Sequence, residues 1–148
     1  MNEAVLKTVN EEEVYTLCKE AIKQEDVHTL CKTLFDIELY PTQEKIVRDI
    51  AFQKERRIIL NCYTQYGKTL AIGVGIALHI LLHNDQKIDI GLLGPAKSDA
   101  RGIRDDMLEY GLNCPEFVDL IDTSKGGDPE DMLQSASKDL VTFADGDI

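Results

Sequence analysis

Residues 57–82 read RIILNCYTQYGKTLAIGVGIALHILL and contain a change of hydrophobic period. The first six residues, 57–62, form a short run rich in β-branched side chains, which is typical of a buried strand. Residues 70–82 are apolar nearly all round, as expected of a helix that packs against a sheet. The polar loop between them ends in GKT at 67–69. The stretch therefore predicts a strand, a loop and a helix in succession.

The same order repeats farther along the chain. Residues 87–93 (KIDIGLL) predict a second strand, and Gly94 and Pro95 break it. A helix is expected from Lys97 or Ser98 to about residue 110. Two strand–loop–helix units in succession predict a parallel sheet, because parallel strands need crossover connections. The predicted fold class is therefore α/β, with the parallel sheet of a RecA-like (ASCE) P-loop NTPase.

The N-terminal part of the chain predicts helices. Residues 14–22 and 30–35 carry apolar side chains at helical spacing, and another helix opens near residue 41, with Thr42 as a suitable N-cap. We expect a helical N-terminal segment over 1–34 and the N-terminal part of an ATPase domain over 35–148. A strand at 140–143 and a turn at 145–146 close the sequence, which suggests a hairpin cut at its turn and a longer parent protein.

Composition narrows the class of protein. The chain has 148 residues, 43% of them hydrophobic, and a formal net charge of −11. Such an acidic chain is unlikely to coat nucleic acid over its whole surface. Four cysteines occur without any CxxC pair, which favours reduced thiols in a cytoplasmic protein over a zinc site. The sequence shows neither a signal peptide nor an apolar run of transmembrane length.

Gly67, Lys68 and Thr69 carry the main chemical signal. A loop at a helix N-terminus offers backbone N–H groups to phosphate oxygens. Lys68 would reach the β- and γ-phosphates, and the Thr69 hydroxyl would bind Mg²⁺. The full phosphate-loop pattern has glycine where Cys62 stands, so the match is incomplete. The alternative is a glycine turn followed by a surface lysine.

A second motif, Tyr40-Pro41-Thr42-Gln43, lies upstream of this loop. A glutamine amide can form two hydrogen bonds with the N6/N7 edge of adenine. Phe35 or Tyr40 could stack on the base. In front of a phosphate loop the motif predicts ATP rather than GTP, and the alternative is an ordinary solvated helix start.

Three segments together resemble the ATPase domain of viral (phage-type) terminase large subunits: LYPTQEKIVRDI, RRIILNCYTQYGKTLAIG and IGLLGPAKSDARGIRDDM. The family has an adenine motif of the P-x-Q type and a deviant Walker A ending in R-Q-x-G-K-T. Its arginine is replaced by Thr64 here. The resemblance implies catalytic roles for Lys68 and Thr69, with Mg²⁺ on Thr69. It also implies a nucleotide site formed by Tyr40, Gln43, Thr64, Gln65, Tyr66, Gly67, Lys68, Thr69 and Leu70.

This resemblance implies an ATP- and Mg²⁺-dependent motor that moves double-stranded DNA, works as a homo-oligomer, and meets a portal and a small terminase subunit in the host cell cytoplasm, without membrane contact. The sequence lacks the Asp-Glu pair of a Walker B motif. We therefore expect ATPase activity only in a full-length parent. The motifs are shared in part with superfamily 2 helicases and translocases. A non-catalytic nucleotide-binding interaction domain is the third alternative.

Lys97, Arg101 and Arg104 follow the second predicted strand, in the region where translocases meet nucleic acid. Arg101 or Arg104 could also replace the missing loop arginine at the γ-phosphate. Because Asp99, Asp105 and Asp106 are interleaved with them, a solvated helix face is the alternative.

Overall fold

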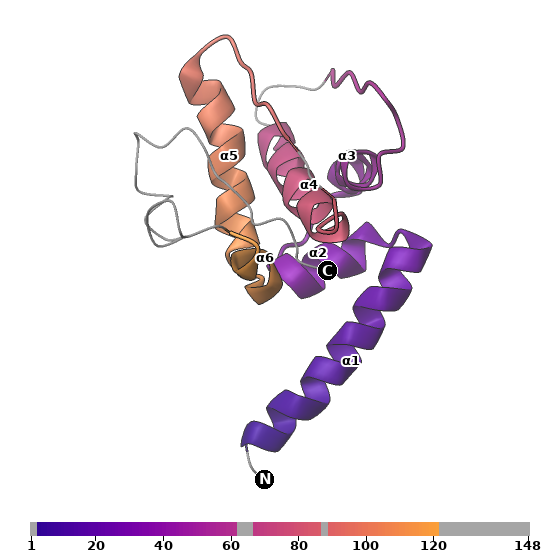
Figure 1. The fold of residues 1–148 in the computed structure, drawn as a ribbon. Coiled ribbons are helices and arrows are strands. Elements are labelled where there is room, and N and C mark those ends of the chain that lie inside the picture. The colour runs from indigo at the N-terminus through magenta and orange to yellow at the C-terminus, as the bar shows by residue number, and fades with distance from the viewer. Residues whose placement is uncertain (1–2, 62–66, 87–88, 122–148) are drawn as a thin grey trace.

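The computed structural model describes residues 3–61, 67–86 and 89–121, and the secondary structure of these residues is helical (Figure 1). The helices are α1 (Glu3–Gln24), α2 (Val27–Phe35), α3 (Pro41–Ala51), α4 (Lys68–Leu82), α5 (Lys97–Gly111) and α6 (Pro115–Asp119). None of the helices in this part of the chain is both long and apolar enough to cross a membrane.

The predicted α/β fold with a parallel P-loop sheet is wrong. Both stretches expected to be strands lack regular secondary structure where described, at 57–61 and 89–93, and neither pairs into a sheet among the described residues. Ile59 and Leu93 are 93% and 95% exposed. β-Branched runs favour strands only where cross-strand neighbours and a buried face are available. In the described part of the chain, helices pack on helices instead, and the strand expected at 140–143 lies outside it.

The apolar character of α4 is explained by its central position between α3 and α5. Two glycines allow the neighbours to come close. A Cβ atom on Gly73 would lie 2.9 Å from the Cβ of Asp106 on α5, and one on Gly75 would lie 3.1 Å from the Cβ of Ile50 on α3. These two glycines therefore allow the neighbouring helices α3 and α5 to pack closely on α4.

Along α4, its neighbours on α3 and on α5 follow in the same order as in their own helices. At the start of α4, Gly67 touches Gln43 near the start of α3, and farther along, Gly75 meets Ile50 near the end of α3. On the other side, Thr69 lies beside Gly102, whereas Gly73 lies one helical turn later beside Asp106. Figure 1 shows α4 and α5 descending side by side. All three helices therefore begin at the same end of the bundle.

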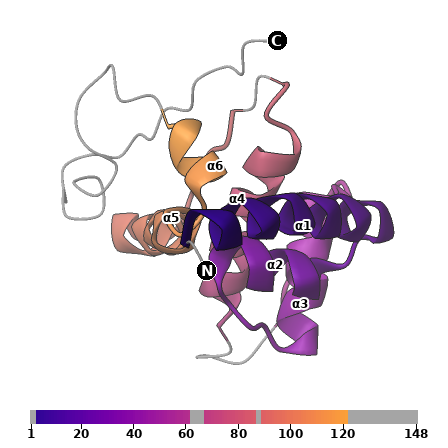
Figure 2. The ribbon, with the colours of Figure 1, turned by 90° about the horizontal axis from the view of Figure 1, so that it is seen from below.

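The remaining helices cover the other end. Asp26 caps α2 because its Oδ1 accepts a hydrogen bond from the Thr29 N–H at 3.1 Å, and its Oδ2 accepts one from the Thr29 hydroxyl at 2.6 Å. The side chain of Phe117 on α6 is fully buried and lies against Gly111. Helix α1 packs mainly on α2, and in the view from below it lies in front of the other helices (Figure 2).

Candidate nucleotide-binding site

The predicted phosphate-binding residues lie at the start of α4. Gly67 is the N-cap of the helix and adopts a left-handed conformation with φ of +72°. Lys68 and Thr69 are the first two helical residues, and the carbonyl of Gly67 accepts the hydrogen bond of the Ala71 N–H at 2.9 Å. The first N–H groups of a helix have no acceptor within it, so this end of α4 can receive an anion. Lys68, Thr69 and Leu70 are partly exposed.

Gln43 lies against Gly67, although 24 positions separate them in the sequence. A Cβ atom placed on Gly67 would overlap Nε2 of Gln43. The other end of the amide, Oε1, accepts a hydrogen bond from the backbone N–H of Tyr40 at 2.9 Å. Gln43 thus caps the start of α3 and contacts the start of α4. The structure brings together the two motifs that the sequence assigned to adenine and to phosphate.

The residues expected to contact the base differ in their solvent exposure. Gln43 is only 7% exposed, so most of its amide is enclosed. Tyr40 is 74% exposed, whereas Phe35 is fully buried in the core. Of the two aromatic candidates for stacking on a base, only Tyr40 is accessible. Thr64, Gln65 and Tyr66 lie outside the described residues.

The basic residues of α5 lie on a face of the helix other than the one that contacts α4. Lys97, Arg101 and Arg104 recur at helical spacing and share one face of α5, whereas Gly102 and Asp106, which contact α4, lie on another. Lys97 is exposed and Arg101 is half-buried.

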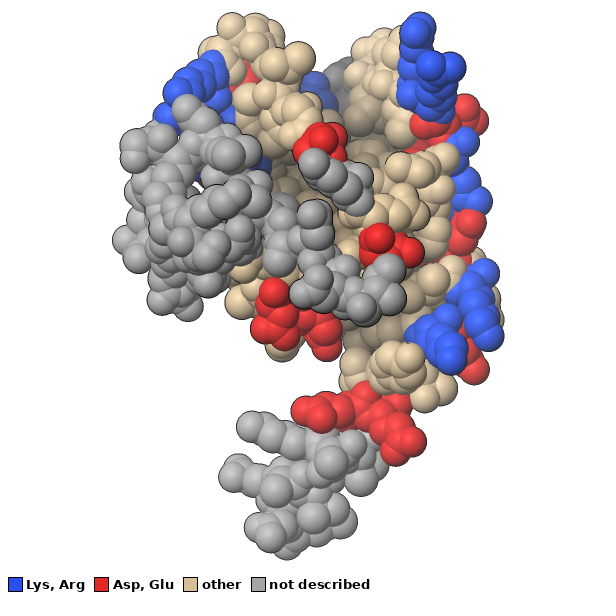
Figure 3. All heavy atoms as spheres, in the orientation of Figure 1, with Lys and Arg blue, Asp and Glu red and all other residues tan. Residues whose placement is uncertain are grey.

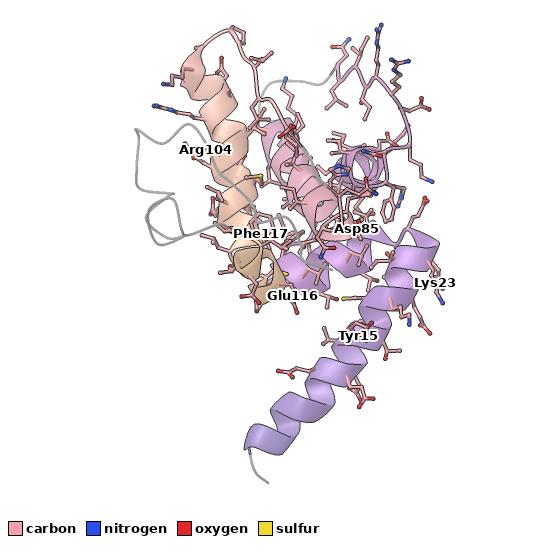
Figure 4. All side chains as sticks on the ribbon, in the orientation of Figure 1. Tyr15, Lys23, Asp85, Arg104, Glu116 and Phe117 are labelled. Atoms are coloured by element: carbon pink, nitrogen blue, oxygen red, sulfur yellow. The ribbon has the colours of Figure 1, made fainter. Side chains whose placement is uncertain are left out.

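Arg104 is labelled on α5 in Figure 4. Its side chain is buried, with 6% of its surface exposed. Its Nη2 and Nε donate to Oδ1 of Asp105 at 2.6 and 3.0 Å. The neighbouring carboxyl of Asp106 has a raised pKa, because burial and then Glu109 and Asp105 disfavour its charged form. A buried guanidinium with a carboxylate partner is poorly placed to meet DNA from the surface. The nucleic-acid role of these three residues stays a prediction.

Gly102 was not among the expected site residues. A Cβ on it would lie 3.8 Å from the Thr69 methyl group, which is ordinary van der Waals contact. Gly102 is therefore the residue of α5 that lies beside Thr69 at the start of α4. A glycine in the interior of a helix hints at close packing, but the sequence alone does not tell against which neighbour.

His79 and His83 have the spacing of a metal-binding pair, but the structure gives them packing roles. His79 is buried, and its Nδ1 lies 3.2 Å from the carbonyl oxygen of Ala51, while Nδ1 of His83 lies 3.0 Å from the carbonyl oxygen of His79. Each contact places a proton on Nδ1, since a carbonyl can only accept. Nε2 of His79 lies 3.5 Å from the amide nitrogen of Gln53. Within the described ranges, no three His, Cys, Asp or Glu residues are grouped to hold a metal.

Comparison with protein-family models, with curated proteins and with solved structures gives no match for this chain. The chemistry of the site is therefore argued from its residues.

Proposed function

We propose that this chain binds ATP with Mg²⁺ at the start of α4 and is the ATP-binding part of a terminase-type DNA-packaging motor. The observation that carries the proposal is the contact between Gln43 and Gly67. Two motifs with separate roles in nucleotide recognition meet at one end of the bundle, where α3, α4 and α5 all begin. The proposal rests on these helix starts and requires no sheet among the described residues.

The roles follow from the residue types. The Lys68 ammonium contributes a positive charge to the β- and γ-phosphates, and the N–H groups at the start of α4 receive phosphate oxygens. The hydroxyl of Thr69 is a ligand for Mg²⁺, which prefers oxygen. The exposed ring of Tyr40 provides a stacking surface for the base. Gln43 fixes the relative position of the two helix starts.

Hydrolysis belongs, in this proposal, to a longer parent protein. Phosphoryl transfer needs carboxylates that hold Mg²⁺ and position water, and the sequence has no Asp-Glu pair after an apolar run. Such a parent would act as a homo-oligomer on double-stranded DNA, together with a portal and a small terminase subunit, in the host cell cytoplasm. A superfamily 2 helicase or translocase would use the same residues for nucleotide.

One observation favours a second function, that of a non-catalytic nucleotide-binding interaction domain. The Gln43 amide is enclosed and serves as a helix cap, which leaves little of it open to a base. A domain of this kind would keep the arrangement of α3 and α4 without turning over nucleotide. Its acidic surface would then serve to bind a basic partner protein.

Calorimetric titration of Mg-ATP into the wild type and Lys68→Ala tests the main proposal. Loss of one charge-assisted contact should weaken binding by about 10- to 100-fold. Lys54→Ala is the matched control, because Lys54 follows the far end of α3, where it pairs with Glu25. Equal affinity of wild type and Lys68→Ala would remove the phosphate site. If the wild type does not bind Mg-ATP at all, the chain is better described as an interaction domain that binds no nucleotide.

A further inference from the structure

Helix α1 projects from the rest of the molecule. It has 22 residues, a length of about 33 Å at 1.5 Å per residue. Its main packing partner is α2, and Ala21 is its buried anchor. Figure 1 shows the N-terminal part of α1 reaching away from the other helices. A single helix of this kind gains little from its own propensity, since most helical stability in proteins comes from packing.

One side of α1 is exposed and carries an ordered pattern of side chains. On a helix with 3.6 residues per turn, six residues fall within one arc of about 120°. All six are exposed. We call this set the α1 stripe: Glu11, Glu12, Tyr15, Lys19, Ile22 and Lys23.

The α1 stripe contains two large apolar side chains. Tyr15 is 68% exposed and Ile22 is 41% exposed, and Val14 and Leu17 are exposed on another side of α1. Tyr15 and Lys23 project from α1 into solvent (Figure 4). A tyrosine ring that offers its face to a lysine or to an aliphatic side chain is typical of protein interfaces.

The charges of the α1 stripe are separated along the helix. Glu11 and Glu12 lie toward the projecting end, and Lys19 and Lys23 lie toward α2. Figure 3 shows this order as red, then tan, then blue side chains along α1. Within one helix, Lys19 and Lys23 are four residues apart and repel each other. The pattern is complementary to its own reverse: an antiparallel copy places acidic residues opposite basic ones, whereas a parallel copy places like charges together.

We propose that α1 is a self-association element and that two copies of this chain pair their α1 stripes in antiparallel orientation. Glu11 and Glu12 of one copy lie opposite Lys19 and Lys23 of the other, on both sides of a twofold axis. Tyr15 lies near the middle of the interface, and Ile22 lies beside Lys23, opposite the acidic pair of the other copy. Each copy presents the same surface, as a symmetric dimer requires. At physiological salt the screening length is about 8 Å. The attraction between these close charge pairs is therefore screened less than the repulsion between the more distant acidic surfaces of the two copies.

Sedimentation equilibrium of the full chain tests this pairing through a charge swap. The all-basic variant carries Glu11→Lys and Glu12→Lys, and the all-acidic variant carries Lys19→Glu and Lys23→Glu. Each variant alone should dimerise at least about tenfold more weakly than the wild type, because like charges now face each other. An equimolar mixture of the two should restore the dimer as a heterodimer. Circular dichroism checks that both variants keep their helices.

Two features separate the proposal from general charge effects. The all-basic variant changes the net charge from −11 to −7, because each of the two Glu→Lys changes adds two positive charges. Weaker repulsion between whole molecules would increase non-specific association. Pairing of the α1 stripes predicts the opposite, a weaker dimer. Glu13→Lys is the matched control, because Glu13 is exposed on another side of α1 and should leave the dimer intact. A wild type that is monomeric at every concentration, a dimer that ignores both variants, or a mixture that does not recover would each overturn the proposal.

Discussion

The side-chain amide of Gln43 lies directly against the α-carbon of Gly67, so that α3 and α4 begin in contact. The amide oxygen of Gln43 holds the backbone N–H of Tyr40, while the amide nitrogen faces the glycine. Gly67 allows this contact for two reasons: it lacks a Cβ atom, and it tolerates a φ of +72°.

Gly67→Ala should impair both the fold and nucleotide binding. The added methyl group overlaps Nε2 of Gln43 and forces an L-residue into the left-handed region, which costs about 1–2 kcal/mol before any steric repulsion. We expect a lower free energy of unfolding in urea and weaker Mg-ATP binding by calorimetry.

Gly102→Ala is the control for this change on the opposite wall of the site. Its methyl group meets the Thr69 methyl at 3.8 Å without strain. An alanine inside α5 should raise the free energy of unfolding by about 0.5–1 kcal/mol and leave Mg-ATP affinity unchanged. If Gly67→Ala behaved like Gly102→Ala, the contact with Gln43 would have no energetic weight.

A base-reading role for Gln43, which requires its amide to turn from the cap of α3 toward the nucleotide, predicts that Gln43→Ala changes the nucleotide preference. Guanine presents O6 where adenine presents N6–H, so a glutamine reader loses one hydrogen bond with GTP, and the wild type should prefer ATP by about tenfold. The alanine variant should bind both nucleotides equally, as measured by competition.

Asp26→Ala separates this effect from simple loss of stability. Asp26 caps α2 as its N-cap residue, whereas Gln43 caps α3 from the third helical position, and removal of either side chain should cost about 1 kcal/mol. Asp26 lies away from the start of α4, so its variant should keep the ATP preference. Parallel behaviour of the two variants would reduce Gln43 to a helix cap.

The helices were predictable because their signals are local. A helix was expected from residue 97 or 98 to about 110, after the break at Gly94 and Pro95, and the structure has α5 at Lys97–Gly111. Starts were less certain: α3 begins at Pro41 after Tyr40, so Thr42 is not its N-cap. The absence of paired strands was not predictable, because a β-branched run such as 57–61 specifies a strand only with a neighbour to pair with.

The site was predictable to the extent that residue type dictates chemistry. A lysine after a glycine at a helix start indicates an anion site from sequence alone. The contact of Gln43 with Gly67 and the wall formed by Gly102 depend on how helices pack, which no local pattern contains. The burial of Arg104 likewise comes from tertiary structure and removes a cation from the exposed surface that the sequence suggested.

Gly73→Ala should destabilise the bundle. The new methyl group would stand 2.9 Å from both the Asp106 Cβ and the Met107 backbone nitrogen. Backbone atoms cannot move aside as a flexible side chain does, so α4 and α5 must separate, at a cost of about 1–3 kcal/mol. Urea unfolding followed by circular dichroism measures this loss. Gly91→Ala has open space around its methyl group and should change the free energy of unfolding by less than about 0.5 kcal/mol.

His79 should make the stability of the fold depend on pH below neutrality. Burial, and to a lesser extent the neighbouring His83, lower the pKa of His79, whereas the hydrogen bond to the Ala51 carbonyl opposes the shift. In the unfolded chain the imidazole has its ordinary pKa of about 6.5. Above this pH both states are neutral and His79 adds no pH dependence. As the pH falls below it, the unfolded chain takes up the proton first, so the free energy of unfolding decreases until the folded pKa is passed.

His79→Asn tests this contribution, because asparagine retains an N–H donor for the Ala51 carbonyl and has no proton to gain. The free energy of unfolding is measured in urea at pH 5, 6, 7 and 8 for both proteins. The wild type should lose stability relative to His79→Asn between pH 6.5 and 5, with a slope that cannot exceed about 1.4 kcal/mol per pH unit for one proton. At pH 7 and 8 the difference between the proteins should be constant and reflect packing alone. His28→Asn is the control, since His28 is exposed and pairs with Glu44 at 2.8 Å on the surface. A difference between wild type and His79→Asn that stays constant down to pH 5 would show that His79 takes up its proton as readily in the fold as in the unfolded chain.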